Sequence, residues 1–259
     1  MDSKIEYGLV EMGGPRHLYR ERLIINFVKE AKTKGLILDA GCGDGSLSLA
    51  LAKYGFKVEA FDLASGCVAM LKEKARNADL NGRIKCYQGD IREIKFSAGI
   101  FDGIVCGEVL EHVQDDRKVV REFNRVLKLG GICVVTVPIN PELWDLWDEM
   151  AGHIKRYKKQ ELIELFEGNG FKIEKLNFWG FPLMRFYHRT IFLLWAKITR
   201  FKKDSERNRC TLTKIGKNTL VSSLIANIFK VDNLFSRLPW GIGAILCAKK
   251  VENLKMNEG

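Results

Sequence analysis

The sequence predicts an α/β protein with a doubly wound, mainly parallel sheet of seven strands and a helical insertion before the last strand. Strand-like and helix-like segments alternate from residue 35 to residue 138, as in a parallel sheet with crossover helices. The segment "ICVVTVP" at 132–138 is almost wholly apolar, which is typical of a central strand covered on both faces. Ligands of such a sheet bind beyond the carboxyl ends of its strands, so the informative residues are expected there.

The first three strands and two helices follow in order. "GLILDA" at 35–40 is a short apolar strand, and "SLSLALAKYG" at 46–55 has leucines at helical spacing and ends in glycine. "FKVEAFD" at 56–62 alternates like a strand, and "VAMLKEKARNADLNG" at 68–82 reads as a helix stopped by Asn-Gly. "RIKCYQGD" at 83–90 is the third strand, so the glycines after residue 40 lie in a strand-to-helix turn.

The later elements are also predicted by their patterns. "FDGIVCGEVLEHV" at 101–113 begins as a buried strand, and "DDRKVVREFNRVLKLGG" at 115–131 predicts an amphipathic helix closed by two glycines. A helix is expected from about Lys158 to Gly168. "FKIEKLNFWG" and "GIGAILCAKK" are expected to be two more strands.

Charge is unevenly distributed along the chain. The net charge is +10, but residues 1–150 hold 21 Lys/Arg and 23 Asp/Glu, so the remainder carries +12. The basic half is expected to meet nucleic acid, an anionic phospholipid surface or a phosphorylated substrate, unless its lysines form a plain solvated surface.

Seven cysteines without a C-x-x-C pair indicate reduced thiols, and the N-terminus resembles no signal peptide. We therefore expect a cytoplasmic protein.

The strand-to-helix turn carries three glycines and an acid. Gly41, Gly43 and Gly45 lack the G-x-G-x-x-G spacing of dinucleotide sites, and no Gly-Lys-Ser/Thr follows them. Asp39 puts a negative charge beside the bare turn, which suits a cationic amino-acid ligand better than a phosphate. An NAD-dependent oxidoreductase is therefore disfavoured.

The pattern D-x-G-x-G-x-G after the first strand resembles the S-adenosylmethionine site of the class I methyltransferases, which have a Rossmann-like sheet. The resemblance implies S-adenosylmethionine as cofactor, with Asp39 near its ammonium group. Its methionine and ribose portions would lie against the backbone of Gly41, Cys42, Gly43 and Gly45. Asp62, which ends the second strand and precedes Leu63, would accept the ribose hydroxyls, unless it only caps the following helix.

The next two strand ends extend the resemblance. In this family the position of Asp90 bonds the adenine amino group, and Ile91 lies beside it; a surface-turn aspartate is the alternative. Gly107 and Glu108 would lie along the cofactor at the mouth of the acceptor site. "EVLEHV", "LKLGG" and "GHIKRYKKQELIELFEGNGF" look like the small-molecule branch called type 11 or ubiquinone-methyltransferase-like.

We expect one methyltransferase domain with four parts. Residues 1–34 form a lid helix, 35–180 the cofactor-binding core, 181–238 a helical cap, and 239–259 the last strand and tail. In the lid, Arg16, His17 and Tyr19 are expected to cover the methionine carboxylate or the substrate. The alternative is a plain amphipathic helix with its apolar side chains on the core side.

Methyl transfer from a sulfonium needs in-line positioning, and a base where the acceptor must lose a proton. His153 in "AGHIKRY" is our first candidate for that base, with Arg156 and Tyr157 orienting the substrate or closing the site, and His112 is the second. A histidine that only packs a loop is the alternative for His153.

Glu108, Glu111 and His112 follow the spacing E-x-x-E-H, and on a helical turn they share one side. Some ubiquinone-pathway O-methyltransferases use a similar motif with a divalent metal. We nevertheless expect no metal here and favour His112 as a polar group on the substrate side.

The composition of the predicted cap bears on the class of methyl acceptor. The segment 178–203 is apolar, aromatic and basic, which suits either a membrane interface with a lipid-like acceptor or a cap buried against "LVSSLIANIF". We favour the buried cap. The expected function is methyl transfer to O, N or C of a small-molecule or lipid-like acceptor, with peripheral contact at the inner face of the membrane as a further option. RNA methylation and non-catalytic cofactor binding are the alternatives, and no feature indicates an oligomeric state.

Overall fold

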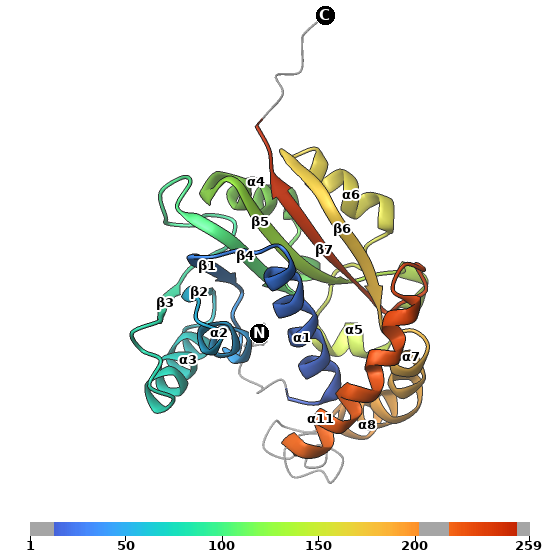
Figure 1. Cartoon of the computed structure of the whole chain (residues 1–259). Coiled ribbons are helices and arrows are strands. Elements are labelled where there is room, and N and C mark those ends of the chain that lie inside the picture. Colours follow the sequence, from blue (N-terminus) through green and yellow to red (C-terminus); the bar gives the residue numbers. More distant parts are fainter. Residues whose placement is uncertain (1–12, 202–217, 253–259) are drawn as a thin grey trace, which may run out of the picture.

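The computed structural model describes residues 13–201 and 218–252, and its centre is one seven-stranded sheet in the order β3-β2-β1-β4-β5-β7-β6 (Figure 1). The first five strands run parallel, whereas β7 pairs antiparallel with both β5 and β6. The predicted mainly parallel, seven-stranded sheet is thus confirmed. The strands are β1 Leu36–Ala40, β2 Lys57–Asp62, β3 Ile84–Gln88, β4 Phe101–Gly107, β5 Leu127–Pro138, β6 Phe171–Trp179 and β7 Gly243–Lys250.

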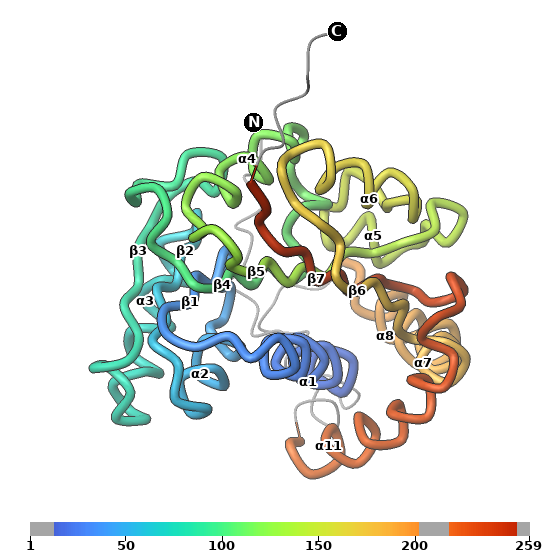
Figure 2. The backbone as a smooth tube through the Cα atoms, turned by 45° about the horizontal axis from the view of Figure 1, so that its top comes forward, coloured from blue at the N-terminus to red at the C-terminus, as the bar shows by residue number. Residues whose placement is uncertain are grey.

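Helices cover both faces of the sheet. On one face, α4 and α6 enclose one apolar core with the strands; on the other, α1, α2 and α3 enclose a second (Figure 2). The helices of the core are α1 Pro15–Glu30, α2 Ser46–Lys53, α3 Ser65–Asn77, α4 Asp116–Val126, α5 Leu146–Ala151 and α6 Lys159–Glu167, with the short turns η1 Leu110–His112 and η2 Pro141–Leu143. This two-faced burial explains why the central strands are almost continuously apolar.

One predicted boundary is wrong. Helix α4 ends at Val126, and "LKLGG" already belongs to strand β5 rather than closing the helix. Leu127 is fully buried and pairs with Phe101, after which the register shifts before Gly103. Gly130, with φ of 76°, supplies the backbone conformation that lets the strand take this irregular path. The glycines thus serve a strand irregularity and not a helix cap.

The insertion between β6 and β7 is helical, as expected. Its described elements are α7 Leu183–Tyr187, the π-helix η3 His188–Phe192, α8 Leu193–Thr199, α11 Thr219–Ile228 and the 3-10 helix η4 Phe229–Phe235. Helix α11 packs on the lid helix α1, where Arg22 donates hydrogen bonds to Ser223 Oγ at 2.8 Å and Asn227 Oδ1 at 3.0 Å.

The prediction that the cap's apolar face is buried against "LVSSLIANIF" holds only in part. Tyr187 packs on Phe229, the last residue of that segment, with ring centres 5.5 Å apart, but other apolar side chains of both segments remain uncovered. Leu194 and Ile198 on α8, and Leu220 and Leu224 on α11, are all exposed in the structure. Polar side chains dock α11 on α1, and Ser222 and Ala226 of α11 are buried, whereas Leu220, Leu224 and Ile228 are exposed. Within the described ranges, no helix is long and apolar enough to cross a bilayer.

The cysteines agree with the expectation of reduced thiols. Each of the six within the described residues is free, and all but Cys86 are buried. Burial raises the pKa of Cys67 and of Cys247 to about 11, so these thiols stay protonated at neutral pH. Cys210 lies outside the described residues.

Candidate functional site

The glycine turn joins β1 to α2, and its three glycines all have positive φ, of 83°, 51° and 80° in order. A Cβ atom at Gly41 or at Gly45 would stand 2.4 Å from Val109 Cγ2 or Leu71 Cδ1, respectively. At Gly43 a Cβ would meet nothing within 4 Å. Two of the glycines are therefore required by packing as well as conformation, whereas Gly43 borders open space at the predicted cofactor site.

Asp39 lies within β1 just before this turn and is almost completely buried. Its Oδ2 atom accepts a hydrogen bond from Ser48 Oγ at 2.5 Å. Burial raises the pKa of Asp39 to about 7, with smaller contributions from neighbouring carboxylates and against the opposing effect of the Ser48 hydrogen bond. A cationic ammonium nearby would favour the ionised carboxylate, as the prediction for Asp39 requires.

Asp62 ends β2 on the other side of the turn. Its Oδ2 accepts from the Gly43 amide at 2.9 Å and its Oδ1 from the Ala64 amide at 2.8 Å. Ala64 is the N-cap of α3, so Asp62 itself is not the helix cap that we considered. Each carboxylate oxygen has a second lone pair, so both remain able to accept a ribose hydroxyl. Leu63 beside it is exposed.

Asp90 and Ile91 follow β3, and their roles at the adenine stay predictions. Arg92 Nε contacts both carboxylate oxygens of Asp90 at 3.0 Å, and its NH2 lies 2.5 Å from Oδ2. The Arg92 hydrogen bonds lower the pKa of Asp90 despite its partial burial. Ile91 is buried in the core beside Ile94. The Asp90 carboxylate is thus paired with Arg92, and since the Ile91 side chain is buried, its backbone is the part left for the predicted contact with the cofactor.

The carboxyl end of β4 lies under the lid helix. Glu108 adopts a left-handed conformation with φ of 57°, which is rare for a residue with a side chain, and such strain clusters at functional sites. Its Oε2 lies 3.7 Å from Arg20 NH1 of α1, while Oε1 is buried without a hydrogen bond among the described residues. A Cβ at Gly107 would stand 3.3 Å from Ile24 Cδ1 of the same helix.

The three predicted lid residues, Arg16, His17 and Tyr19, contact three different parts of the structure. His17 Nε2 lies 2.8 Å from Ser46 Oγ at the start of α2, so this residue does reach the glycine turn. Tyr19 donates to Asn233 in the cap at 2.7 Å, and Arg16 NH1 lies 2.9 Å from His188 Nδ1. Of the three lid residues that we expected over the cofactor, only His17 lies beside the turn.

The acceptor side centres on His153, whose Nδ1 lies 2.7 Å from Asp148 Oδ1. Asp148 is fully buried and also accepts two-pronged hydrogen bonds from the Arg156 guanidinium at 2.8–3.0 Å. Burial acts to raise the pKa of Asp148, but the hydrogen bonds from His153 and Arg156 outweigh it and lower the pKa to about 2. Asp148 is therefore a carboxylate at neutral pH and fixes the orientation of the His153 ring.

Glu111 lies on the other side of His153, with Oε1 3.8 Å from His153 Nε2. Its side chain is fully buried, and neither carboxyl oxygen has a hydrogen bond to any described residue. Burial, together with the neighbouring Glu108, raises the pKa of Glu111 well above its usual range. We therefore take Glu111 as protonated at neutral pH, since an isolated buried carboxylate is very costly.

His112 completes this group. Its ring centre lies 4.9 Å from that of His153, and its Nδ1 is 3.1 Å from the Gly152 carbonyl oxygen. Burial and then His153 lower the pKa of His112, so the ring is neutral near pH 7. The structure thus brings both predicted histidines together with Glu111, on η1 and on the loop after α5.

Glu111, His112 and His153 could hold a metal ion, because each offers one ligand atom and these atoms lie within 4.8 Å of one another. Both Nδ1 atoms are held by oxygen acceptors, which leaves the Nε2 atoms as the coordinating ones. Two imidazoles and a carboxylate suit zinc and similar divalent ions. Glu108 is not in this group, because its left-handed backbone directs it to Arg20 instead.

Sequence reasoning missed Asp148 and the contact network around His188. His188 joins the lid and α5, since its Nε2 lies 2.7 Å from Asp145 Oδ2 and its Nδ1 contacts Arg16. Burial, followed by the Arg16 charge, lowers the pKa of His188 to about 4, so it is neutral. The D-x-x-D spacing of Asp145 and Asp148, a capping box at the start of α5, was the available signal.

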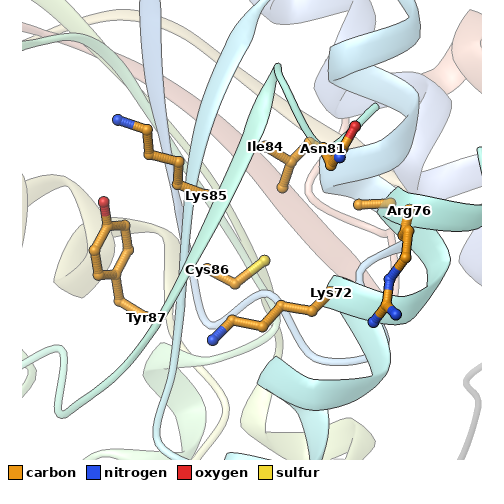
Figure 3. A pocket seen from close by; sticks show the side chains of 8 residues that line it. Lys72, Arg76, Asn81, Ile84, Lys85, Cys86 and Tyr87 are labelled. Carbon is orange, nitrogen blue, oxygen red and sulfur yellow. The ribbon is translucent and has the colours of Figure 1, made fainter. Parts of the chain in front are cut away.

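Two surface pockets lie away from the glycine turn. A pocket of about 380 Å³ sits between α3 and the edge strand β3, and Figure 3 shows Lys72, Arg76 and Lys85 among the side chains around it. A second, of about 530 Å³, lies between the start of α5 and α8, with Trp144 and Phe201 in its lining. No residue predicted for the cofactor lines either one. The site is accordingly defined by its chemistry rather than by these hollows.

Known proteins resemble the chain in sequence and in fold. The ubiquinone biosynthesis O-methyltransferase of Coxiella burnetii is 35% identical over 118 residues, which are 45% of this chain and 50% of that protein. The chloroplastic 2-methyl-6-phytyl-1,4-hydroquinone methyltransferase 1 of Oryza sativa is 27% identical over 175 residues, 65% and 51% of the two chains. The chain therefore spans about half the length of the curated relatives it matches.

Among solved structures, the geranyl diphosphate C-methyltransferase of Streptomyces coelicolor, in complex with Mg2+, geranyl diphosphate and S-adenosyl-L-homocysteine, superposes with a TM-score of 0.61. It is 15% identical and covers 91% of this chain and 80% of its own, a likeness of fold alone. The family model described as "Methyltransferase domain" matches residues 16–176, and this stretch contains the glycine turn and all the strand ends described above. Because that match covers more than half of the chain, the chain belongs to the methyltransferase domain family, as the resemblance to class I S-adenosylmethionine-dependent enzymes led us to expect.

Proposed function

We propose that this chain binds S-adenosylmethionine and transfers its methyl group to O, N or C of a small-molecule or lipid-like acceptor. The observation that carries the proposal is the arrangement at the carboxyl ends of β1 and β2. There the open space at Gly43 adjoins the Asp62 carboxylate, and the buried Asp39 stands behind the turn. An open backbone, a ribose acceptor and a negative charge match the chemistry of this cofactor.

The cofactor, when bound, supplies a methyl group already activated on a sulfonium. Asp62 would accept the ribose hydroxyls with its remaining lone pairs, and Asp39 would face the ammonium end. Gly107 and Glu108 would border the cofactor where β4 meets the lid. Asp90 would contact adenine only after its pairing with Arg92 is rearranged. His17 and Arg20 of the lid would help to exclude water from this end.

His153 would be the general base for an acceptor that loses a proton. Because Asp148 is ionised and accepts from Nδ1, it favours the tautomer whose Nε2 carries the lone pair. The acceptor's proton would pass to Nε2, and Asp148 would stabilise the resulting imidazolium. A phenolic hydroxyl is the acceptor group that needs such a base, and the names of both relatives point to aromatic acceptors of the quinone type.

A second candidate for the same cluster is a divalent cation held by Glu111, His112 and His153. The observation in its favour is that neither oxygen of the buried Glu111 carboxyl has a hydrogen bond to a described residue. A bound cation would supply the missing partner and keep Glu111 ionised. Metal analysis of the purified protein, and transfer assays with and without a chelator, decide between a protonated Glu111 and a metal centre.

We further propose a cytoplasmic location with peripheral attachment to the membrane, which suits a lipid-like acceptor. The basic second half of the chain supports it.

Calorimetric titration with S-adenosylmethionine, and separately with NADH, tests the cofactor assignment. We expect binding of the first only. Asp62→Ala should weaken it by about ten- to hundredfold, the usual loss for hydrogen bonds to a charged group. Glu73→Ala, on the exposed side of α3, is the matched control and should bind normally. Binding of NADH, or equal affinity in both variants, would overturn the proposal. Screening phenolic, prenylated and lipid compounds with methyl-labelled cofactor then identifies the acceptor.

A further inference from the structure

We propose that the outer face of the helical cap docks on an anionic lipid bilayer. The outer stripe, as we call it, consists of Ile191, Leu194 and Ile198, which are between 47% and 54% exposed. Their spacing of three and four residues puts them on one side of η3 and α8. A continuous apolar stripe on the surface of a basic cap marks a binding surface rather than scattered exposure.

The opposite side of α8 is already packed, so the outer stripe contributes nothing to the core. Ala196 and Thr199 are fully buried on that inner side. The Phe192 and Trp195 rings face inward too, with centres 4.9 Å and 6.3 Å from that of Trp147 in α5. Helix α8 is therefore apolar on both sides while lying at the surface of the described structure, a pattern that calls for an apolar environment outside.

Helix α11 repeats this arrangement at the same end of the molecule (Figure 1). Leu220, Leu224 and Ile228 are 50–81% exposed and spaced four residues apart, on the side away from its contact with α1. Ser222 and Ala226 are the buried residues of that helix. Two helices of one insertion thus each present an apolar stripe.

The positive charge of the cap surface favours a bilayer with anionic headgroups. Among the described residues 181–201 and 218–238, all basic side chains lie at the surface or half-buried: Arg185, Arg189, Lys197, Arg200, Lys230 and Arg237. The one acid in these ranges, Asp232, is buried and accepts hydrogen bonds from the Leu183 and Met184 amides at 2.9 Å and 3.0 Å. The exposed charge of the described cap is therefore purely basic, which complements anionic headgroups while the stripe enters the acyl boundary.

The second pocket lies between the cap and α5, so it connects the docking surface with the acceptor end of the site. Its volume is about 530 Å³, and Lys197, Arg200 and Phe201 of the cap face Asp145 and Leu146 of α5 across it. Helix α5 also carries Asp148, which holds the proposed base. A lipid-like acceptor leaving the bilayer at the cap would thus reach the acceptor end by a short path. The docking gives a surface to the proposed peripheral attachment, and this last step rests in addition on the proposed methyl transfer.

Vesicle flotation tests the docking without any turnover. We expect the wild type to float with phosphatidylcholine vesicles containing phosphatidylglycerol and only weakly with pure phosphatidylcholine. The double variant Leu194→Glu/Ile198→Glu should remain in the bottom fraction. Leu129→Glu, an exposed leucine at the opposite end of β5, is the matched control and should float like the wild type. The charge variant Arg189→Gln/Lys197→Gln should bind about fivefold more weakly for each cation removed, and Lys57→Gln should not.

Circular dichroism and S-adenosylmethionine titration confirm that every variant is folded, so a folding defect cannot imitate lost docking. Absence of wild-type flotation, or equal flotation of the double variant, would overturn the proposal. It would also be overturned if light scattering showed a wild-type dimer that the double variant abolishes, with no vesicle binding, because the stripe would then join two copies of this chain. Cofactor binding is measured separately, so failure of the docking and failure of the proposed function are distinguishable.

Discussion

The site has a cofactor end, at the glycine turn with Asp39 and Asp62, and an acceptor end, at Glu111, Asp148 and His153. The two ends differ in whether their buried polar groups have hydrogen-bond partners. At the cofactor end, Asp39 and Asp62 both accept hydrogen bonds from neighbouring residues in the turn and its helix. At the acceptor end, both carboxyl oxygens of Glu111 are buried without hydrogen bonds among the described residues. The first end is built by the protein itself, whereas the second is completed by a proton, an ion or a substrate.

The two ends also differ in how far apart in the sequence the segments that form them lie. The cofactor end joins segments that are close in sequence, and the backbone conformations of three glycines shape it. The acceptor end joins η1, the loop after α5 and, through Asp145 and His188, the cap and the lid. We therefore expect substitutions at the cofactor end to alter cofactor affinity, and those at the acceptor end to alter stability and turnover.

The largest effect on rate is expected from His153→Gln. Loss of the general base should lower turnover of a hydroxyl acceptor by about a hundred- to ten-thousandfold, with S-adenosylmethionine affinity unchanged. Single-turnover assays with the labelled cofactor, beside calorimetric titration of the same variant, measure both. Full turnover in His153→Gln would remove the general-base role and leave His153 as a packing residue.

The largest effect on stability is expected from Asp148→Ala. It leaves the Arg156 guanidinium buried without its carboxylate, and breaking one partner of a buried ion pair costs about 3–5 kcal/mol. Urea unfolding measures the loss, with Glu149→Ala, an exposed neighbour on α5, as the matched control. A loss no greater than that of the control would mean that the pair does not hold the acceptor end together.

A smaller effect separates Gly43 from Gly55. Both have positive φ, and a Cβ at either meets nothing within 4 Å, so Gly→Ala at each should cost about 1–2 kcal/mol of backbone strain. Only Gly43→Ala should also lower S-adenosylmethionine affinity, by about tenfold, because its methyl group would enter the cofactor space. Equal affinity of the two variants would place the cofactor elsewhere.

A pH dependence is expected at Asp39. Its pKa is raised from the usual 3.8 to about 7, chiefly by burial, so the folded state holds a proton that the unfolded state releases. Stability should therefore fall as pH rises from about 4 to 7, and cofactor affinity should rise as the carboxylate ionises near pH 7. Unfolding and calorimetry across this range, with Asp39→Asn as the flat control, check both signs. A pH-independent wild type would show an unperturbed Asp39.

The sequence by itself determined the seven strands, their alternation with helices and the glycine turn, because periodicity and glycine placement are local properties of the chain. The family match and the sheet topology confirm these. The sequence also placed Asp62 at the end of the second strand, which the structure confirms, and its role at the ribose stays a prediction.

Only the tertiary structure decided which side chains meet. Asp148 lies 37 residues after Glu111 in the sequence, and only the folding of α5 against η1 brings both to His153. The end of α4 was misjudged because Leu127 pairs with Phe101, a long-range contact that overrides local helix propensity. The cap was misjudged in part because apolar periodicity identifies a face but not what covers it, and α11 docks on the lid instead of covering α8.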